Sequence, residues 1–324
     1  MPGIITITFS PCIDKSASVH SLLPEKKLKC SMPKLEPGGG GINVARAIQK
    51  LGGKATAIFP SGGYTGKFFN KLIQDEGVPS IIIETENETR ENFIILEESS
   101  NLQYRFGMPG TGLKETEWQQ LLKAVEEAKG VEFIVASGSL PSGMPTDIFA
   151  RLAVITKRKK AKLIVDTSGE PLKQAIREEI YLIKPSIREL SSLVDKEYLQ
   201  PNEIAEAAKQ VIEKGRCTII IVSLGSAGAM LVTKDLIQTI TPPPVKIKST
   251  VGAGDSMVAG IVLLLSKGSS LEKAVQYGVA CGTAATMNAG TELCKSEDAE
   301  TLYMLINNSG ASPAIVNIKS GYSV

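Results

Sequence analysis

The sequence predicts an α/β fold, a doubly wound and mostly parallel sheet with helices on both faces and a small β lid. From residue 114 onward, short apolar runs alternate with amphipathic helical stretches, the pattern of a parallel sheet buried on both faces. Two stretches, residues 16–36 and 88–107, interrupt the pattern with short strands and turns. The 324 residues are enough for one α/β core with a small appendage.

The elements of the first half follow from local composition. β-branched residues favour strands, and apolar residues at helical spacing, such as Ile42, Ala45 and Ile48, favour a helix. In order, we expect a strand at 4–9, a helix at 42–51, a strand at 55–62, a helix at 66–77 and a strand at 80–85.

The second half repeats this alternation. We expect helices at 115–129, 146–159, 187–194, 203–215, 256–268 and 271–288, and strands that begin at 131, 161 and 181, with a strand–turn–strand unit over 217–232. The pattern is lost after residue 306, which predicts a loose tail.

The two interrupting stretches are expected to form the lid. Residues 88–107 show two short strands around the polar turn EESSN, which is typical of an antiparallel hairpin. We expect this hairpin to pack with residues 16–36. The core would then comprise 1–15, 37–87 and 108–309, and the tail 310–324.

Composition and charge narrow the possible functions. Lys and Arg number 36 and Asp and Glu 34, so the formal net charge is +2. This balance predicts neither a nucleic-acid nor a membrane partner, and it is compatible with small anionic ligands.

The five cysteines contain no C-x-x-C pair, so we expect reduced thiols rather than zinc or disulfides. With no signal-like start in MPGIITITF, we expect a cytoplasmic protein.

The single histidine, His20, lies in a polar, turn-bearing stretch and is expected at the surface. If the protein is an enzyme, its general base is therefore expected to be a carboxylate.

Two common nucleotide-binding motifs are approached in this sequence, but each lacks a residue that it requires. In SGGYTGKF, Ser61 and Phe68 replace residues that a Walker A loop requires, and in GAGDSM the third glycine position holds Met257.

The segment TVGAGDSMVAG suggests an anion site. Gly252, Ala253 and Gly254 lead into a helix whose first N–H groups have no internal partner and can surround a phosphoryl oxygen. Asp255 would then lie beside that group and could accept a proton from an attacking hydroxyl. An ordinary N-cap after a glycine turn explains this stretch equally well.

Other segments that follow predicted strands offer binding groups, because ligands of such sheets bind at the carboxyl ends of the strands. The glycines from Gly38 precede Asn43, which could bind sugar hydroxyls on the first turn of a helix. The turn VSLGSAG could hold a nucleotide or be only a hairpin. Lys184 could meet phosphate and Glu189 could hold Mg²⁺ through water, or the two could form a surface ion pair.

The lid carries cations that would suit a phosphorylated substrate. They are Arg90 and Arg105 in one half and Lys27 and Lys29 in the other. Solvated charges on exposed strands explain each of them individually.

Two segments, GGGGINVARAIQKLGG and STVGAGDSMVAG, resemble the signature segments of the PfkB/ribokinase-type carbohydrate kinases. The motifs ATAIFPSGG, YRFGMPG, SGSLPSG, VDTSGE and VSLGSAGA extend the resemblance to about residue 307, and are most similar to bacterial members that act on fructose 6-phosphate. The resemblance implies a ribokinase-like fold and ATP- and Mg²⁺-dependent phosphorylation of fructose 6-phosphate at its 1-hydroxyl. It also implies a homodimer formed through the β lids and, in some members, inhibition by a second MgATP.

The resemblance also implies roles for individual residues. Asp255 matches the catalytic base, and Gly252, Ala253 and Gly254 the anion hole. The sugar-phosphate side would comprise Asp14, Gly38, Gly39, Asn43, Arg90, Arg105 and Ser139. The nucleotide side would comprise Lys27, Lys184, Ser186, Ser223, Gly225, Gly228 and Asn288. The resemblance also implies a site for a monovalent cation such as K⁺, lined by Ser249, Val251, Ala285, Asn288 and Gly290.

Two positions depart from the family pattern. Ser186 occupies the asparagine position of the N-x-x-E motif, and Glu292 replaces a basic residue in GTELC. The first departure bears on Mg²⁺ positioning, and the second on monovalent-cation or nucleotide inhibition behaviour. A kinase for tagatose 6-phosphate or fructose 1-phosphate remains an alternative, as does a non-catalytic sugar-phosphate or nucleotide sensor.

Overall fold

The computed structural model describes residues 3–110 and 112–308. A nine-stranded sheet forms the body, in the order β13-β12-β11-β10-β9-β8-β1-β4-β5. All neighbouring strands from β5 to β11 are parallel, and β12 pairs antiparallel with both β11 and β13. The strands are β1 (Gly3–Ile7), β4 (Thr56–Gly62), β5 (Ser80–Thr85), β8 (Val131–Ser137), β9 (Lys162–Asp166), β10 (Ile180–Ile183), β11 (Cys217–Ser223), β12 (Ala229–Val232) and β13 (Ile237–Ile240).

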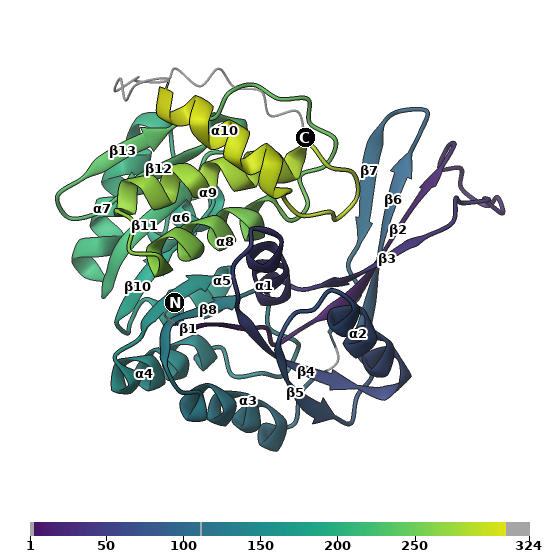
Figure 1. Cartoon of the computed structure of the whole chain (residues 1–324), viewed down its shortest axis with the longest axis horizontal. Coiled ribbons are helices and arrows are strands. Elements are labelled where there is room, and N and C mark those ends of the chain that lie inside the picture. The colour runs from purple at the N-terminus through teal and green to yellow at the C-terminus, as the bar shows by residue number, and fades with distance from the viewer. Residues whose placement is uncertain (1–2, 111, 309–324) are drawn as a thin grey trace.

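Helices cover both faces of this sheet (Figure 1), so the doubly wound prediction is confirmed. One apolar core lies under α1 (Gly40–Lys50), α2 (Gly63–Asp75), α8 (Ala253–Ser266), α9 (Leu271–Thr286) and α10 (Ser296–Asn308). The other lies under α3 (Glu115–Glu127), α4 (Ile148–Lys159), α5 (Gly169–Ala175), α6 (Ile187–Leu193) and α7 (Ile204–Lys214).

A separate four-stranded sheet, the lid, projects from one side of the body (Figure 1). Its order is β3-β2-β6-β7, with β2 (Cys12–Val19), β3 (Lys34–Gly38), β6 (Arg90–Glu97) and β7 (Leu102–Phe106). The two sequence-distant stretches pair directly, since β2 runs parallel to β6. Residues 12–15 and 37–38 belong to lid strands, so the predicted boundaries at 16 and 36 were too narrow.

Three elements differ from the prediction. We predicted neither α5 nor β13, because each is short and follows turn-forming residues. The α10 helix was also missed, since its polar face hides the apolar spacing of Ala299, Leu302 and Ile306. The predicted tail, 310–324, lies outside the described residues.

Within the described ranges, no helix is both long and apolar enough to cross a membrane. The order of the strands reverses at β1, whose neighbours β4 and β8 belong to successive parts of the chain. Ligands of such sheets bind where the strand order reverses, at the carboxyl ends of the strands. This is the edge at which the lid leaves the body, because β2 follows β1 closely (Figure 1).

Candidate active site

The glycine run before α1 lies directly on the carboxyl ends of β1 and β8. A side-chain carbon on Gly40 would come within 2.3 Å of Ser137 Oγ, and one on Gly41 within 2.6 Å of the Ile7 carbonyl oxygen. Gly39 has φ +113°, a conformation that other residues rarely adopt. The first turn of α1 can therefore approach the switch point only because these positions carry no side chain.

The start of α8 reaches the same edge. Its N-cap is Gly252, in a left-handed conformation at φ +74°, and Asp255 lies three residues into the helix. The Asp255 side chain caps nothing and accepts a hydrogen bond from Asn43 Nδ2 at 2.9 Å. The ordinary N-cap interpretation is therefore wrong, because Asp255 faces α1 across the site.

Lys184 and Asp166 lie beside Asp255. Lys184 Nζ is 3.3 Å from Asp166 Oδ1, and a side-chain carbon on Gly254 would lie 3.3 Å from the same Nζ. Asp166 is the last residue of β9 and Lys184 follows β10 directly. Their side chains are only 17% and 9% exposed, so this is a largely buried ion pair rather than the surface pair between Lys184 and Glu189 that the sequence allowed. Asp166 was not among the predicted site residues, although it is the last residue of β9 and so lies at the carboxyl end of the sheet.

The pKa of Asp255 is raised to about 6. Burial is the largest cause, and the Asp166 and Asp14 carboxylates add to it, while the Asn43 hydrogen bond and Lys184 oppose it. Burial also raises the pKa of Asp166 despite its lysine partner. Burial lowers the pKa of Lys184, but the Asp166, Asp255 and Glu189 carboxylates together raise it above the ordinary value. A base with a pKa near 6 is ionised at neutral pH and still basic enough to take a hydroxyl proton.

A pocket of about 250 Å³ opens between the lid and the glycine run. Arg90, which lines it, donates from Nη1 to the Met108 carbonyl and from Nη2 to the Ser10 carbonyl, while its buried Nε has no partner among the described residues. Arg105 also lines it and donates to Thr250 Oγ1 at 2.8 Å, joining the lid to the segment before α8. The lining contains these predicted sugar-side residues: Asp14, Gly39, Arg90 and Arg105.

Asp14 is buried on the lid side of this pocket. Its Oδ1 accepts hydrogen bonds from Asn92 Nδ2 at 3.0 Å and from Cys12 Sγ at 3.3 Å, and burial raises its pKa. A side-chain carbon on Gly38 would come within 2.2 Å of Asp14 Oδ2, so that glycine makes room for the carboxylate. We missed Asn92 because its position gains meaning only from the β2–β6 register.

The predicted nucleotide side follows the ends of β10 and β11. Ser186 and Glu189 form a capping box at α6, with Ser186 N donating to Glu189 Oε2 at 2.7 Å and Glu189 N to Ser186 Oγ at 3.3 Å. Ser186 also bridges to Ser223, whose Oγ is buried without a partner among the described residues. Glu189 therefore already caps a helix, and one of its oxygens remains for another ligand.

The turn VSLGSAG connects two antiparallel strands, β11 and β12, so its hairpin interpretation is correct. Gly225 has φ +61° and Gly228 φ +93°. A side-chain carbon on Gly228 would come within 2.0 Å of the Ile240 carbonyl oxygen. The packing of β13 alone thus requires Gly228, whatever the turn binds.

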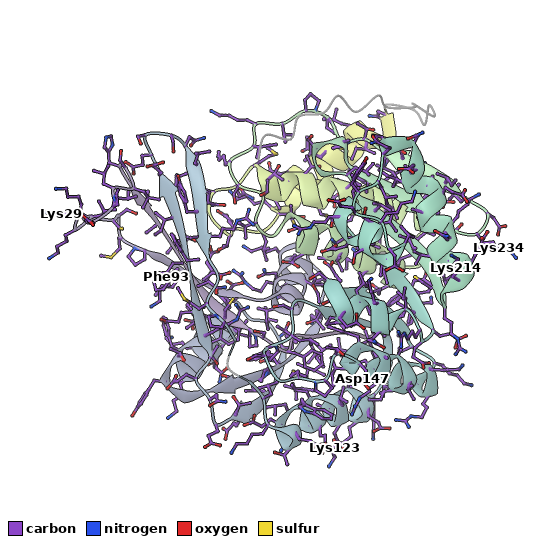
Figure 2. The ribbon with its side chains drawn as sticks, turned by 180° about the vertical axis from the view of Figure 1, so that it is seen from behind. Lys29, Phe93, Lys123, Asp147, Lys214 and Lys234 are labelled. Carbon is purple, nitrogen blue, oxygen red and sulfur yellow. The ribbon has the colours of Figure 1, made fainter. Side chains whose placement is uncertain are left out.

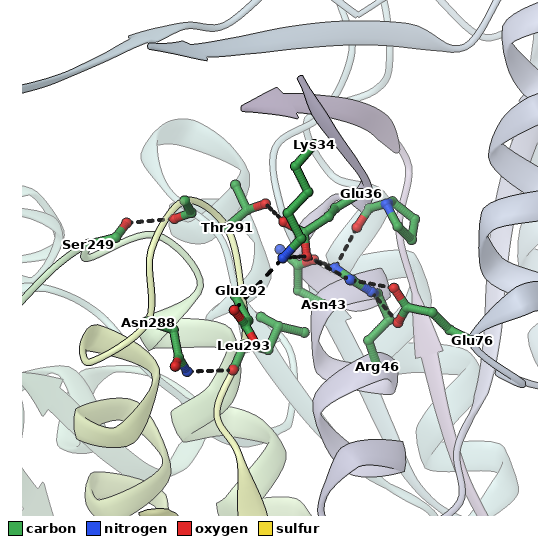
Figure 3. Close-up of polar contacts among 12 residues, drawn as sticks. Lys34, Glu36, Asn43, Arg46, Glu76, Ser249, Asn288, Thr291, Glu292 and Leu293 are labelled. Carbon is green, nitrogen blue, oxygen red and sulfur yellow. Dashed lines mark hydrogen bonds and ion pairs between the residues drawn. The ribbon is translucent and has the colours of Figure 1, made fainter. Parts of the chain in front are cut away.

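The residues predicted to line a monovalent-cation loop come from two segments that lie together. Ser249 Oγ donates to the Gly290 carbonyl at 2.6 Å and accepts from Val251 N at 3.2 Å. Asn288 is buried, and its Nδ2 donates to the Leu293 carbonyl at 3.0 Å (Figure 3). The backbone N–H of Asn288 donates to the Ala285 carbonyl. The loop is therefore built mainly from backbone oxygens.

Two of the predicted site residues, Ser139 and Lys27, lie away from the others. Ser139 is exposed in the loop after β8, with no hydrogen bond among the described residues. Lys27 is exposed on the connection between β2 and β3. Lys29, on the same connection, lies at the outer end of the lid (Figure 2). His20 is exposed, as predicted.

Glu292, which replaces the basic residue of the family pattern, forms ion pairs with two lysines: its carboxylate oxygens lie 3.8 Å from Lys34 Nζ and 3.7 Å from Lys295 Nζ.

The sequence is similar to a known protein family and to several of its members. The model of the family described as pfkB family carbohydrate kinase matches residues 4–298. The ATP-dependent 6-phosphofructokinase isozyme 2 of Escherichia coli K12 is 44% identical, over 95% of this chain and 100% of its own. A 1-phosphofructokinase of Borreliella burgdorferi is 30% identical, over 92% of this chain and 96% of its own.

Solved structures agree with the fold. Escherichia coli phosphofructokinase-2 in complex with fructose-6-phosphate is 42% identical, with a TM-score of 0.90 over 95% of this chain and 100% of that chain. The same enzyme in complex with potassium is 44% identical, with a TM-score of 0.90 and the same coverage. A tetrameric inhibited form is also known, 43% identical with a TM-score of 0.89, over 95% of this chain and 100% of that chain. The fold is thus ribokinase-like, with a small β lid.

Proposed function

The chain belongs to the pfkB family of carbohydrate kinases, and on that basis we propose that it transfers the γ-phosphoryl group of ATP to the 1-hydroxyl of fructose 6-phosphate. The product is fructose 1,6-bisphosphate. One observation carries the proposal: Asp255, with its pKa raised to about 6, lies at the start of a helix beside the buried Lys184 and accepts a hydrogen bond from Asn43. A base, an anion-binding helix start and a cation thus meet at one point.

Asp255 is placed to take the proton of the attacking hydroxyl. The first amides of α8, at Ala253, Gly254 and Asp255, lack helical acceptors and point to the same place. Such amides stabilise a transferring phosphoryl group because they are fixed before charge develops on it. Phosphoryl transfer depends on this positioning and charge compensation more than on covalent chemistry.

The pocket under the lid is suited to a sugar that already carries phosphate. Arg90 and Arg105 line it, and the buried Nε of Arg90 has a hydrogen still to donate. A guanidinium binds phosphate oxygens with directed, charge-assisted hydrogen bonds. Asp14, which also lines the pocket, offers carboxylate oxygens to the sugar hydroxyls, and Asn43 lies beside Asp255 on the first turn of α1.

The region around Lys184 suits the phosphates of ATP and a Mg²⁺ ion. Asp166, Asp255 and Glu189 all act electrostatically on the single Lys184 ammonium, so carboxylates outnumber cations there. Carboxylate oxygens, directly or through water, are the ligands that Mg²⁺ uses at phosphate sites. We infer that Glu189 and Asp166 hold Mg²⁺ through water, and that Lys184, Ser186, Ser223, Gly225 and Gly228 line the nucleotide. Bound Mg²⁺ would neutralise charge on the transferring phosphoryl group.

The loop of backbone oxygens around Ser249 and Gly290 suits a monovalent cation. The potassium complex of the Escherichia coli relative supports K⁺ as its occupant. Mg²⁺ and K⁺ therefore complete the proposed set of ions.

The lid has an apolar outer face that suits a second copy of the chain. Phe93, Tyr104 and Phe106 are 38%, 37% and 46% exposed, and the strand register places them on one face of the lid. Figure 2 labels Phe93 on the lid, apart from the helical body. We propose a homodimer through this face, in which Lys27 reaches the partner's nucleotide region, and a cytoplasmic location where sugar phosphates and ATP occur.

A substrate panel tests the proposed function. The purified chain with MgATP is given fructose 6-phosphate, fructose 1-phosphate, tagatose 6-phosphate or ribose, and ADP release is followed. We expect the highest kcat/KM with fructose 6-phosphate. Preference for fructose 1-phosphate would assign the activity of the 1-phosphofructokinase relatives, and binding of the sugar phosphates without turnover would indicate a sensor.

A further inference from the structure

Arg46 on α1 is a buried cation for which the proposed function gives no role. Its side chain is 1% exposed, although arginine is among the residues that are least often buried. Burying a guanidinium is costly unless its N–H groups all find partners. Such a residue in the helix that carries Asn43 needs an explanation.

Every N–H direction of this guanidinium has a partner (Figure 3). Nε and Nη2 donate to the two carboxylate oxygens of Glu76, at 2.7 and 2.6 Å. Nη1 donates to the Pro37 carbonyl at 2.7 Å and to Asn43 Oδ1 at 3.3 Å. Nη2 also lies 3.5 Å from Glu36 Oε1. The planar fork of arginine can satisfy this set, whereas a lysine ammonium has only three donors.

The hydrogen bond from Arg46 to Asn43 fixes the orientation of the Asn43 side-chain amide. Arginine has only donors, so it takes the amide oxygen and leaves Nδ2 to face Asp255. An NH₂ group can only donate, and a donor favours the ionised form of a carboxylate. The orientation of Asn43 therefore keeps Asp255 ready to act as a base.

The same guanidinium connects this pair to the lid and to the cation loop. Glu36, on β3, accepts from Thr291 Oγ1 at 2.7 Å and lies 3.2 Å from Lys34 Nζ. Burial opposes ionisation of Glu36, but the Thr291 hydroxyl and the Arg46 and Lys34 cations hold its pKa below the ordinary value. Lys34 also faces Glu292, so β3 and the 288–293 loop share one charged cluster (Figure 3).

We propose that Arg46 is a positioning residue for the general base, which orients the Asn43 amide toward Asp255 and ties that orientation to lid strand β3 and the 288–293 loop. The proposal rests on the proposed function for the role of Asp255. Around Asp255, the charged and titratable neighbours are Asp166, Lys184, Asp14 and Cys12, and Arg46 acts on it through Asn43.

The test reads the ionisation of Asp255 directly in the full-length protein. The side-chain carboxyl carbons of aspartate are followed by ¹³C NMR between pH 4 and 8, roughly the range around a carboxyl of raised pKa. Asp255 is assigned by its absence in Asp255→Asn. The titration midpoint is compared in the wild type, Arg46→Lys, Asn43→Ala and the double variant. Arg46→Lys keeps the buried charge and removes the planar fork.

We expect Arg46→Lys to raise the midpoint of Asp255 by about half a pH unit or more, in the direction of Asn43→Ala, because a donor to the carboxylate is loosened. In the Asn43→Ala background the same change should add little, since the path through the amide is already gone. An unchanged midpoint in folded Arg46→Lys, or an equal shift in both backgrounds, would overturn the proposal.

Two further measurements keep the test decisive. If Arg46→Lys does not fold, Glu76→Gln loosens the guanidinium from its half-exposed end, and it should raise the midpoint less but in the same direction. An unchanged Asp255 midpoint in Glu76→Gln would then overturn the proposal.

In steady-state kinetics, Arg46→Lys should lower kcat about tenfold and leave KM for ATP within about twofold. The titration needs no turnover, so it stays readable even if the substrate panel shows no kinase activity.

Discussion

The Asp255 carboxylate lies among groups that push its ionisation in opposite directions. Burial and the carboxylates of Asp166 and Asp14 disfavour the charge, while the Asn43 amide and Lys184 favour it. The result is a pKa of about 6 rather than the ordinary 3.8. This single residue explains why an enzyme whose only histidine is exposed can still have a base near neutral pH.

We predict that Asp255 in the free protein titrates with a midpoint near pH 6. Below that pH the base is protonated, so kcat/KM should fall as pH decreases. The contribution of Asp255 to the free energy of unfolding changes with pH in the opposite direction to that of a carboxylate in an ion pair. Because the folded pKa is raised, this group stabilises the fold most below about pH 4 and loses that contribution as pH rises through about 6. The ¹³C titration of wild type against Asp255→Asn measures the midpoint, and a value near 4 would contradict the account.

Individual residues differ in how far the sequence could predict them. Asp255 and Asn43 lie next to glycines before helices, so local motifs found them. Arg46 could not be found in this way, because its partners Glu36, Glu76 and Thr291 are far apart in the sequence and meet only in the folded chain.

At the scale of elements, α6 shows how one residue can serve both a helix and a site. Ser186 caps α6, and Glu189 completes the capping box. Serine and asparagine are about equally good N-caps. The family asparagine would therefore preserve the helix while placing an amide closer to the nucleotide side.

We predict that Ser186→Asn leaves the free energy of unfolding within about 0.5 kcal/mol of wild type. Its longer side chain should reach the phosphate and Mg²⁺ region, and lower the Mg²⁺ concentration for half-maximal activity severalfold. Ser186→Ala is the matched control, which should destabilise the fold by about 1 kcal/mol through loss of the cap. If Ser186→Asn needs as much Mg²⁺ as wild type, the serine is no handicap in this chain.

The elements themselves were predictable where periodicity was strong. The helix at α1 and the strands that precede the site loops follow apolar patterns that the sheet requires. The lid boundaries were less accurate, because β2 follows β1 after a few residues and no composition change marks Cys12. β13 was missed since it has only four residues, Ile237–Ile240.

At the scale of the whole molecule, two sheets share one site. In the proposed site, the body supplies Asp255 at the start of α8 and Lys184 after β10, and the lid supplies Asp14, Arg90 and Arg105. Contacts such as Arg105 with Thr250 join the two sheets. The exposed aromatic residues of the lid strands, Phe93, Tyr104 and Phe106, lie together on its outer face.

We predict that the chain is a dimer in solution and that Phe93→Glu on the outer face of the lid produces monomers. A charge buried in an apolar interface loses its hydration without gaining a partner. Light scattering after size-exclusion chromatography gives the mass. Tyr64→Glu, which replaces an aromatic residue that is 85% exposed on α2 instead, is the control and should remain dimeric. A Phe93→Glu protein with the mass of a dimer would place the interface elsewhere.

The central claim is that Asp255 is the base for phosphoryl transfer, and Asp255→Asn tests it most directly. We expect kcat with MgATP and fructose 6-phosphate to fall roughly a thousandfold or more, while calorimetry shows nucleotide binding unchanged within about threefold. The variant should be at least as stable as wild type, because it removes a carboxylate whose charged form the fold disfavours. A kcat within about tenfold of wild type, in a folded protein that binds ATP, would contradict the account.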